Sequence, residues 1–133
     1  MTSVSIVSEA LGSGATQGPR PQRPTSSALR SGRMVGQYLC AQGWTALTLD
    51  VTASGGAVQA VFDFHHAPTG VRGRYSMRGQ LRPGGELELA PVAWITQPRG
   101  YVMVGMRGRV GADGTFRGVI LNPSCGAFYV VPS

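Results

Sequence analysis

Residues 57–81, AVQAVFDFHHAPTGVRGRYSMRGQL, decide the fold of this chain. In their first part every second residue is apolar, at Val58, Ala60, Phe62 and Phe64. In their second part three arginines recur at even spacing and so share one face of an extended segment, at Arg72, Arg74 and Arg78. Residues 67–70, between the two parts, have the length and composition of a hairpin turn. This pattern predicts two antiparallel strands, each with one buried face.

The same alternation extends in both directions along the chain. It predicts eight strands, over residues 35–40, 44–51, 57–65, 71–81, 86–89, 101–110, 115–121 and 127–131. Most of the breaks are three or four residues long and carry glycine or proline, which forces antiparallel pairing of consecutive strands. The prediction is an all-β domain, with about eight antiparallel strands in an up-and-down barrel and a two-sheet sandwich as the alternative.

The alternation also predicts the core. The side chains expected to point inward are Leu47, Leu49, Val51, Val58, Ala60, Phe62, Phe64, Leu87, Leu89, Val102, Val104 and Met106. A chain of 133 residues with 20 glycines and 9 prolines fits one turn-rich domain and excludes most large enzyme folds.

Residues 1–34 differ from the rest of the chain. Residues 12–32 are rich in glycine, proline, serine and arginine and have few apolar side chains that could offset the entropy of ordering. We therefore expect a flexible arm over 1–34 and an all-β domain over 35–133. The arm is either a leader or linker, or a segment that binds a partner or joins copies of the chain. No signal peptide or membrane-length apolar run is visible, which favours a cytoplasmic location.

Two cysteines, Cys40 and Cys125, end the first predicted strand and precede the last. In a closed barrel those strands are neighbours, so the two thiols can form one disulfide in an oxidising compartment. In a reducing compartment they are two small buried apolar side chains. Both interpretations stay open from the sequence.

All twelve basic side chains are arginines, and the net charge is +6. The arm and the domain each carry +3, and no basic block emerges, which argues against nucleic acid as the partner. Five arginines form a candidate anion-binding face: Arg72, Arg74, Arg78, Arg107 and Arg109. Glu86 and Glu88 lie on the strand between them, and we expect Arg78 opposite Glu88 in a ladder of opposite charges.

Residues 91–100, PVAWITQPRG, replace the tight turn expected after the fifth strand. Long loops often carry function, so Trp94, Arg99 and Tyr101 are predicted to form a partner-binding rim. The alternative is that Trp94 and Ile95 fold back as a lid over one barrel end. His65 and His66 are adjacent in a strand and point to opposite faces, and no ligand spacing for a metal is present. We predict no catalytic residue, metal or cofactor; Asp63 and His65 share a face, as chance allows in any sheet.

Several motifs resemble those of small bacterial all-β domains of uncharacterised function. They are Gly36-x-Tyr38-x-Cys40-x-Gln42-Gly43, Gly73-x-Tyr75-x-Met77-x-Gly79, Pro91-x-x-Trp94-Ile95-x-x-Pro98-x-Gly100-Tyr101 and Cys125-Gly126-x-Phe128. The resemblance implies an accessory module. Our leading hypothesis is a non-enzymatic interaction module that binds a protein or assembles into a larger complex. The alternatives are a carrier of a small ligand or glycan at the barrel mouth, and binding of a polyanion through the arginine face.

Overall fold

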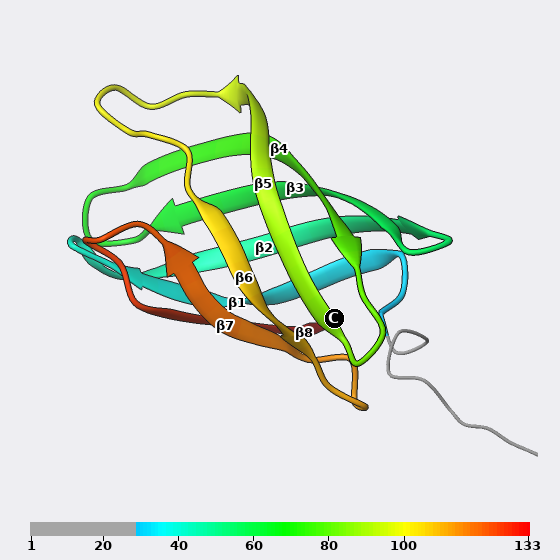
Figure 1. Ribbon diagram of the computed structural model, residues 1–133. Coiled ribbons are helices and arrows are strands. Elements are labelled where there is room, and N and C mark those ends of the chain that lie inside the picture. The colour runs from blue at the N-terminus through cyan, green and yellow to red at the C-terminus, as the bar shows by residue number, and fades with distance from the viewer. Residues whose placement is uncertain (1–28) are drawn as a thin grey trace, which may run out of the picture.

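The computed structural model describes residues 29–133, which form eight antiparallel strands (Figure 1). Consecutive strands pair with each other, and β1 pairs with β8 to close the barrel. They are β1 (Gly32–Cys40), β2 (Gly43–Ser54), β3 (Ala57–His66), β4 (Val71–Leu81), β5 (Glu86–Thr96), β6 (Gly105–Val110), β7 (Phe116–Leu121) and β8 (Ala127–Pro132). The predicted up-and-down barrel is therefore confirmed. The sandwich alternative was wrong, because β1 pairs with β8 and closes the sheet.

Short turns place successive connections at alternate ends of the barrel. The β2–β3 turn is the pair Gly55 and Gly56, both with positive φ (59° and 91°), as the tight turns that match strand twist require. The β1–β2, β3–β4, β5–β6 and β7–β8 connections share the opposite end, which we call the mouth.

The barrel interior is filled by the alternating apolar side chains. All nine residues predicted to point inward on β2, β3 and the start of β5 are buried, as is Met106 on β6. The prediction for Val102 was wrong, since its side chain is 68% exposed. Val102 precedes β6, in a segment that does not pair as a strand, so the strand alternation does not apply to it.

Two facing glycines allow the backbones of β6 and β7 to approach closely. Gly108 of β6 lies directly opposite Gly118 of β7. A Cβ at Gly118 would collide with the backbone carbonyl of Arg107, and a Cβ at Gly108 with that of Arg117. These two positions therefore exclude larger residues, as is typical of sharply curved barrel strands.

The fifth strand is longer than predicted. β5 continues from Leu89 through Thr96, so residues 91–96 form a strand and the loop is residues 97–104. The sixth strand begins at Gly105 and not at residue 101. Pro91 misled the prediction: proline cannot donate to a ladder, but it is tolerated where one edge of the strand has no partner, as here.

The predicted arm lies mostly outside the described residues, which begin at 29. β1 starts at Gly32, three residues before the predicted strand, and Met34 and Leu29 are buried at the barrel end opposite the mouth. Within residues 29–133 there is no helix of the length and hydropathy that crossing a bilayer requires.

Candidate binding surfaces at the mouth and on the outer face

Among the strand pairs from β1–β2 to β5–β6, the β5–β6 pair is the shortest. β5 pairs with β6 only over residues 86–89, ending at Leu89 opposite Met106. Beyond Leu89 the two strands diverge toward the mouth (Figure 1). On the side away from β4, residues 90–96 of β5 therefore have no strand partner in the described part of the chain. We call this side the open edge.

A tyrosine hydroxyl takes the place of the missing strand pairing. Tyr75 of β4 is buried, and its hydroxyl donates to the Val104 carbonyl oxygen at 2.8 Å. The same hydroxyl accepts from the Val104 backbone N–H at 3.1 Å. Because these bonds satisfy both backbone groups of Val104, the segment before β6 is held away from β5 without leaving buried polar groups unpaired.

An aromatic cluster fills the barrel below the mouth, with Phe64 at its centre. Phe64 stacks on Tyr101 (ring centroids 5.4 Å apart) and meets Trp94 edge-on at 6.4 Å. Tyr75 stacks on Phe62 at 4.8 Å and contacts Trp94 edge-on at 5.1 Å. Such contacts add stability beyond the apolar area that they bury.

Above this cluster is an open depression of about 600 Å³. Its floor is aromatic, from Tyr38, Phe62, Phe64 and Tyr75, and polar groups stand around it, including Gln42, Asn122 and Ser124. The disulfide between Cys40 and Cys125 forms part of its wall and ties β1 to the β7–β8 loop.

Buried His66 fixes the turns on the opposite side of the mouth. Its Nδ1 lies 2.8 Å from the Thr69 hydroxyl and its Nε2 lies 3.0 Å from the Gln42 carbonyl oxygen. A carbonyl oxygen only accepts, so Nε2 donates to Gln42, and Nδ1 forms a hydrogen bond with the Thr69 hydroxyl. Buried His66 thus has a structural role, joining the β3–β4 and β1–β2 turns.

Burial determines the protonation of the two inner tyrosines. Desolvation raises the pKa of both the Tyr38 and Tyr75 hydroxyls well above their usual value. Hydrogen bonds from Gln42 and Thr45 to Tyr38 oppose that effect only in part. Both hydroxyls therefore stay protonated at neutral pH and act as neutral hydrogen-bonding groups.

The three predicted rim residues come together near the mouth, but they differ in exposure. Trp94 and Tyr101 are half-buried against the core, whereas Arg99 is exposed in the β5–β6 loop. The lid interpretation was wrong for Ile95, whose side chain on β5 is 53% exposed. Trp44 is 48% exposed beside the β1–β2 turn.

Three other apolar side chains near the rim are exposed, and sequence reasoning did not assign any of them to it. Val92 and Ile95 lie on β5, next to the open edge, and are 49% and 53% exposed; Val102 lies in the loop. The signal was present in the unbroken apolar run that follows Pro91, which departs from strict alternation.

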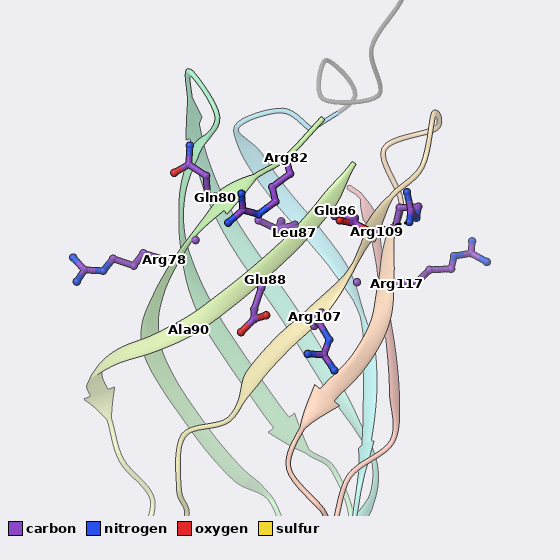
Figure 2. A pocket seen from close by; sticks show the side chains of 12 residues that line it. Arg78, Gln80, Arg82, Glu86, Leu87, Glu88, Ala90, Arg107, Arg109 and Arg117 are labelled. Carbon is purple, nitrogen blue, oxygen red and sulfur yellow. Dashed lines mark hydrogen bonds and ion pairs between the residues drawn. The ribbon is translucent and has the colours of Figure 1, made fainter. Parts of the chain in front are cut away.

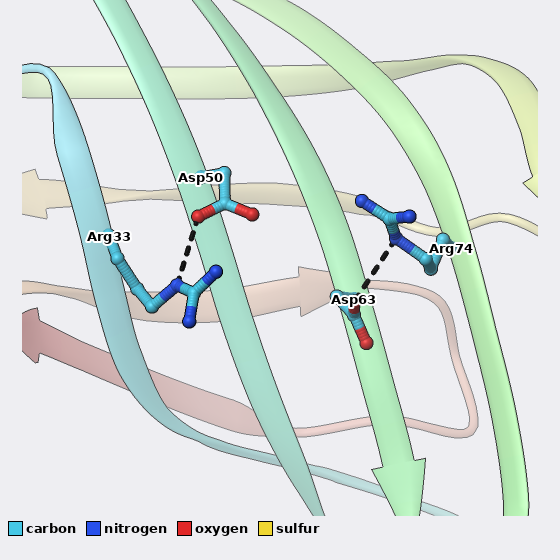
Figure 3. A network of polar contacts seen from close by, with 4 residues as sticks. All are labelled: Arg33, Asp50, Asp63 and Arg74. Carbon is cyan, nitrogen blue, oxygen red and sulfur yellow. Dashed lines mark hydrogen bonds and ion pairs between the residues drawn. The ribbon is translucent and has the colours of Figure 1, made fainter.

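The five predicted anion-binding arginines are divided between two places. Arg78, Arg107 and Arg109 lie around one outer depression, joined by Arg82 and Arg117, which sequence reasoning did not include (Figure 2). Arg74 is instead bound to Asp63 on β3 at 3.1 Å, in the same way as Arg33 is bound to Asp50 at 3.2 Å (Figure 3). Arg72 lies opposite His65 in the β3–β4 register.

The predicted pairing of Arg78 with Glu88 was wrong. Gln80 lies opposite Glu88, and Arg78 lies opposite Ala90. Residues 82–85 form the β4–β5 turn, and the partner of Arg78 is displaced by two residues along β5, from the expected Glu88 to Ala90. Glu88 instead faces Arg107 on β6, and Glu86 faces Arg109.

The described part of the chain has no group of three or more His, Cys, Asp or Glu side chains placed to hold a metal ion. Asp63, which shares a strand face with His65, is bound to Arg74 on the outer surface. In comparisons with known proteins, no family model matches the chain, and no curated protein matches its sequence.

Proposed function

We propose that this chain is a non-enzymatic interaction module that binds an extended segment of a protein partner along the open edge of β5. The observation that carries the proposal is the unpaired side of residues 90–96. Backbone donors and acceptors on a sheet edge are satisfied by an added strand, which is a common mode of peptide recognition.

The side chains beside the open edge fit the same partner. Val92 and Ile95 are half-exposed and apolar, and residues 90–96 carry no charged side chain of the kind that blocks exposed edges. Pro91, near the start of the edge, has no N–H to donate to an added strand, so pairing is expected mainly over residues 92–96. Arg99 and Tyr101, at the end of the edge, supply a cation and an aromatic ring of the kind enriched in binding hot spots. An added strand would place its side chains against Val92 and Ile95 as cross-strand neighbours.

The test is selection of peptides from a random displayed library on the full-length chain, followed by affinity measurement with the selected peptides. The double variant Val92→Lys/Ile95→Lys should weaken binding about tenfold or more, since it removes apolar cross-strand contacts. The matched control Val119→Lys/Val131→Lys changes exposed valines on β7 and β8 and should bind like the parent.

Hydrogen exchange gives a second readout that does not depend on the substitutions. Bound peptide should slow amide exchange in residues 90–96. Peptides that bind both double variants equally well, or that protect another strand instead, would contradict the proposal. Light scattering on the chain alone distinguishes a second copy on the edge from a separate partner.

The aromatic depression supports a second candidate function, binding of one small ring-shaped ligand at the mouth. Its size falls in the range of ligand pockets, and it combines an aromatic floor with a few polar groups. Thermal-shift screening with small glycans and aromatic compounds tests it, because a ligand that binds the native state raises Tm. Tyr101→Ala should abolish any such shift, whereas the exposed Tyr129→Ala should not.

A further inference from the structure

A second surface of the barrel, on its outer face, concentrates positive charge. Arg78 comes from β4, Arg82 from the β4–β5 turn, Arg107 and Arg109 from β6 and Arg117 from β7. Together with Glu86 and Glu88 of β5 they surround a depression of about 780 Å³, and we call this surface the arginine face. In Figure 2, Arg78 and Arg117 lie on its two flanks, with the other charged groups between them.

The two carboxylates neutralise only part of this charge. Glu86 is paired with Arg109 at 3.2 Å, and Arg109 also donates to the Gly84 carbonyl oxygen at 2.8 Å. Glu88 faces Arg107 across β5 and β6. Five guanidinium groups against two carboxylates leave three positive charges unbalanced, and within residues 29–133 no ion pair involves Arg78, Arg82 or Arg117.

The arginine face lacks the groups that other classes of ligand require. Its depression is lined by charged side chains, glycine backbone and Gln80, and its one large apolar side chain, Leu87, is buried. The lining has no aromatic ring on which single-stranded bases could stack and no exposed large apolar side chain that could anchor a protein interface. The chemistry that remains is recognition of closely spaced anionic groups by guanidinium forks.

The disulfide narrows the class of anion. A bond between Cys40 and Cys125 persists in oxidising compartments such as the periplasm or the cell exterior. Acidic polysaccharides, which carry regularly spaced sulfate or carboxylate groups, occur in such compartments. The arginine face crosses four strands, which is roughly 14 Å at the usual strand spacing, so it matches a chain with several charges better than a single ion.

We propose that the arginine face binds an acidic polysaccharide, independently of the open edge of β5. Arg78, Arg107 and Arg117 contact its sulfate or carboxylate groups, while the Arg109–Glu86 pair holds the middle of the face in place. Because the contacts are charge-assisted and exposed, binding depends steeply on salt.

The test uses the full-length chain with heparin as a sulfated probe and polygalacturonate as a carboxylated probe, measured by calorimetry at several salt concentrations. Arg107→Gln/Arg117→Gln should weaken binding of at least one probe tenfold or more and flatten its salt dependence. The control Arg30→Gln/Arg72→Gln removes the same charge from exposed positions outside the face and should bind nearly as tightly as the parent. Circular dichroism checks that each variant is folded.

Equal weakening in both double variants would overturn the proposal, because it would indicate attraction to net charge only. Failure of both polysaccharides to bind at low salt would also overturn it. So would tighter binding of duplex DNA than of heparin or polygalacturonate. Val92→Lys/Ile95→Lys should leave polysaccharide binding intact. Loss of peptide binding and loss of polysaccharide binding are therefore separable.

Discussion

The first half of the barrel, β1–β4, and the second half, β5–β8, are built from the same alternating pattern but differ in regularity. β2 and β3 pair along almost their whole length, as do β3 and β4. β5 has register shifts against β4 and pairs with β6 only over residues 86–89. The open edge and the arginine face both involve β5, whereas the floor of the aromatic depression comes from β1, β3 and β4. The irregular half thus contains the unpaired backbone and most of the arginines of the arginine face.

Removal of the disulfide should have the largest effect on stability, since the disulfide links β1 in the regular half to the β7–β8 loop in the irregular half. Cys40 and Cys125 are 85 residues apart, and a cross-link over that distance is worth about 4 to 5 kcal/mol in the chain-entropy model. Cys40→Ser/Cys125→Ser should lower the free energy of unfolding by that amount, measured by urea titration. Reductant should lower it similarly in the parent and not at all in the variant. A loss below about 1 kcal/mol would show that the cross-link does not constrain the unfolded chain.

The regular half was also the more predictable one. Four segments from Val35 to Leu81 were located to within a few residues, because strict alternation and glycine turns agree there. The strand through Trp94 was missed because Pro91 is unfavourable within a strand and the apolar run after it breaks the alternation that located the other strands. No sequence pattern indicates that a side chain, Tyr75, replaces a strand as the partner of Val104.

The candidate sites were predictable only in part, since pairing register determines which side chains meet. A four-residue turn at residues 82–85 moved Arg78 away from Glu88 and brought Arg82 into the arginine face. Arg74 was lost from the predicted set because Asp63, on the neighbouring strand, lies directly opposite. Such pairings depend on two-residue displacements, which keep every side chain on its face and are therefore not specified by alternation.

The glycine pair at the β6–β7 contact should show the next largest effect. Gly118→Ala places a Cβ against the Arg107 carbonyl and should cost about 1 to 3 kcal/mol through forced backbone shifts. Gly126→Ala is the matched control: its added Cβ would meet Leu39 at an ordinary 3.6 Å, so stability should change by less than about 1 kcal/mol. Equal losses in urea titrations of the two variants would show that the close approach of β6 and β7 can relax.

Removal of the Tyr75 hydroxyl tests whether its hydrogen bonds hold the segment before β6 in place, where β5 and β6 diverge. Tyr75→Phe leaves the Val104 N–H and carbonyl without partners and should cost about 1 to 2 kcal/mol. Amide exchange at residues 101–106 should accelerate more than in β2 or β3. Tyr129→Phe, which loses only an exposed bond with Gln37, is the control and should cost less than about 0.5 kcal/mol. Unchanged exchange before β6 would mean that packing alone holds this segment.

Alkaline pH should have the smallest effect, and it acts through the two buried tyrosines. Burial raises the pKa of Tyr38 and Tyr75, so the folded chain keeps both protons at a pH where the unfolded chain begins to lose them. The folded state then binds more protons, and stability falls as pH rises through about 10, the usual tyrosine value. By pH 10 the loss is about 0.8 kcal/mol for the two groups together.

This effect can be measured cleanly, because the chain has no lysine to titrate in the same range and both cysteines are in the disulfide. Urea titrations between pH 8.5 and 10 should show this decline in the free energy of unfolding of the parent. In Tyr38→Phe the decline, measured from the variant's own free energy of unfolding at pH 8.5, should be about half as large. Parallel declines in the two proteins would mean that Tyr38 ionises as readily in the barrel as in the unfolded chain. Water would then reach the Tyr38 hydroxyl more readily than the burial of this residue implies. The depression above it would be a weaker binding site for an apolar ring.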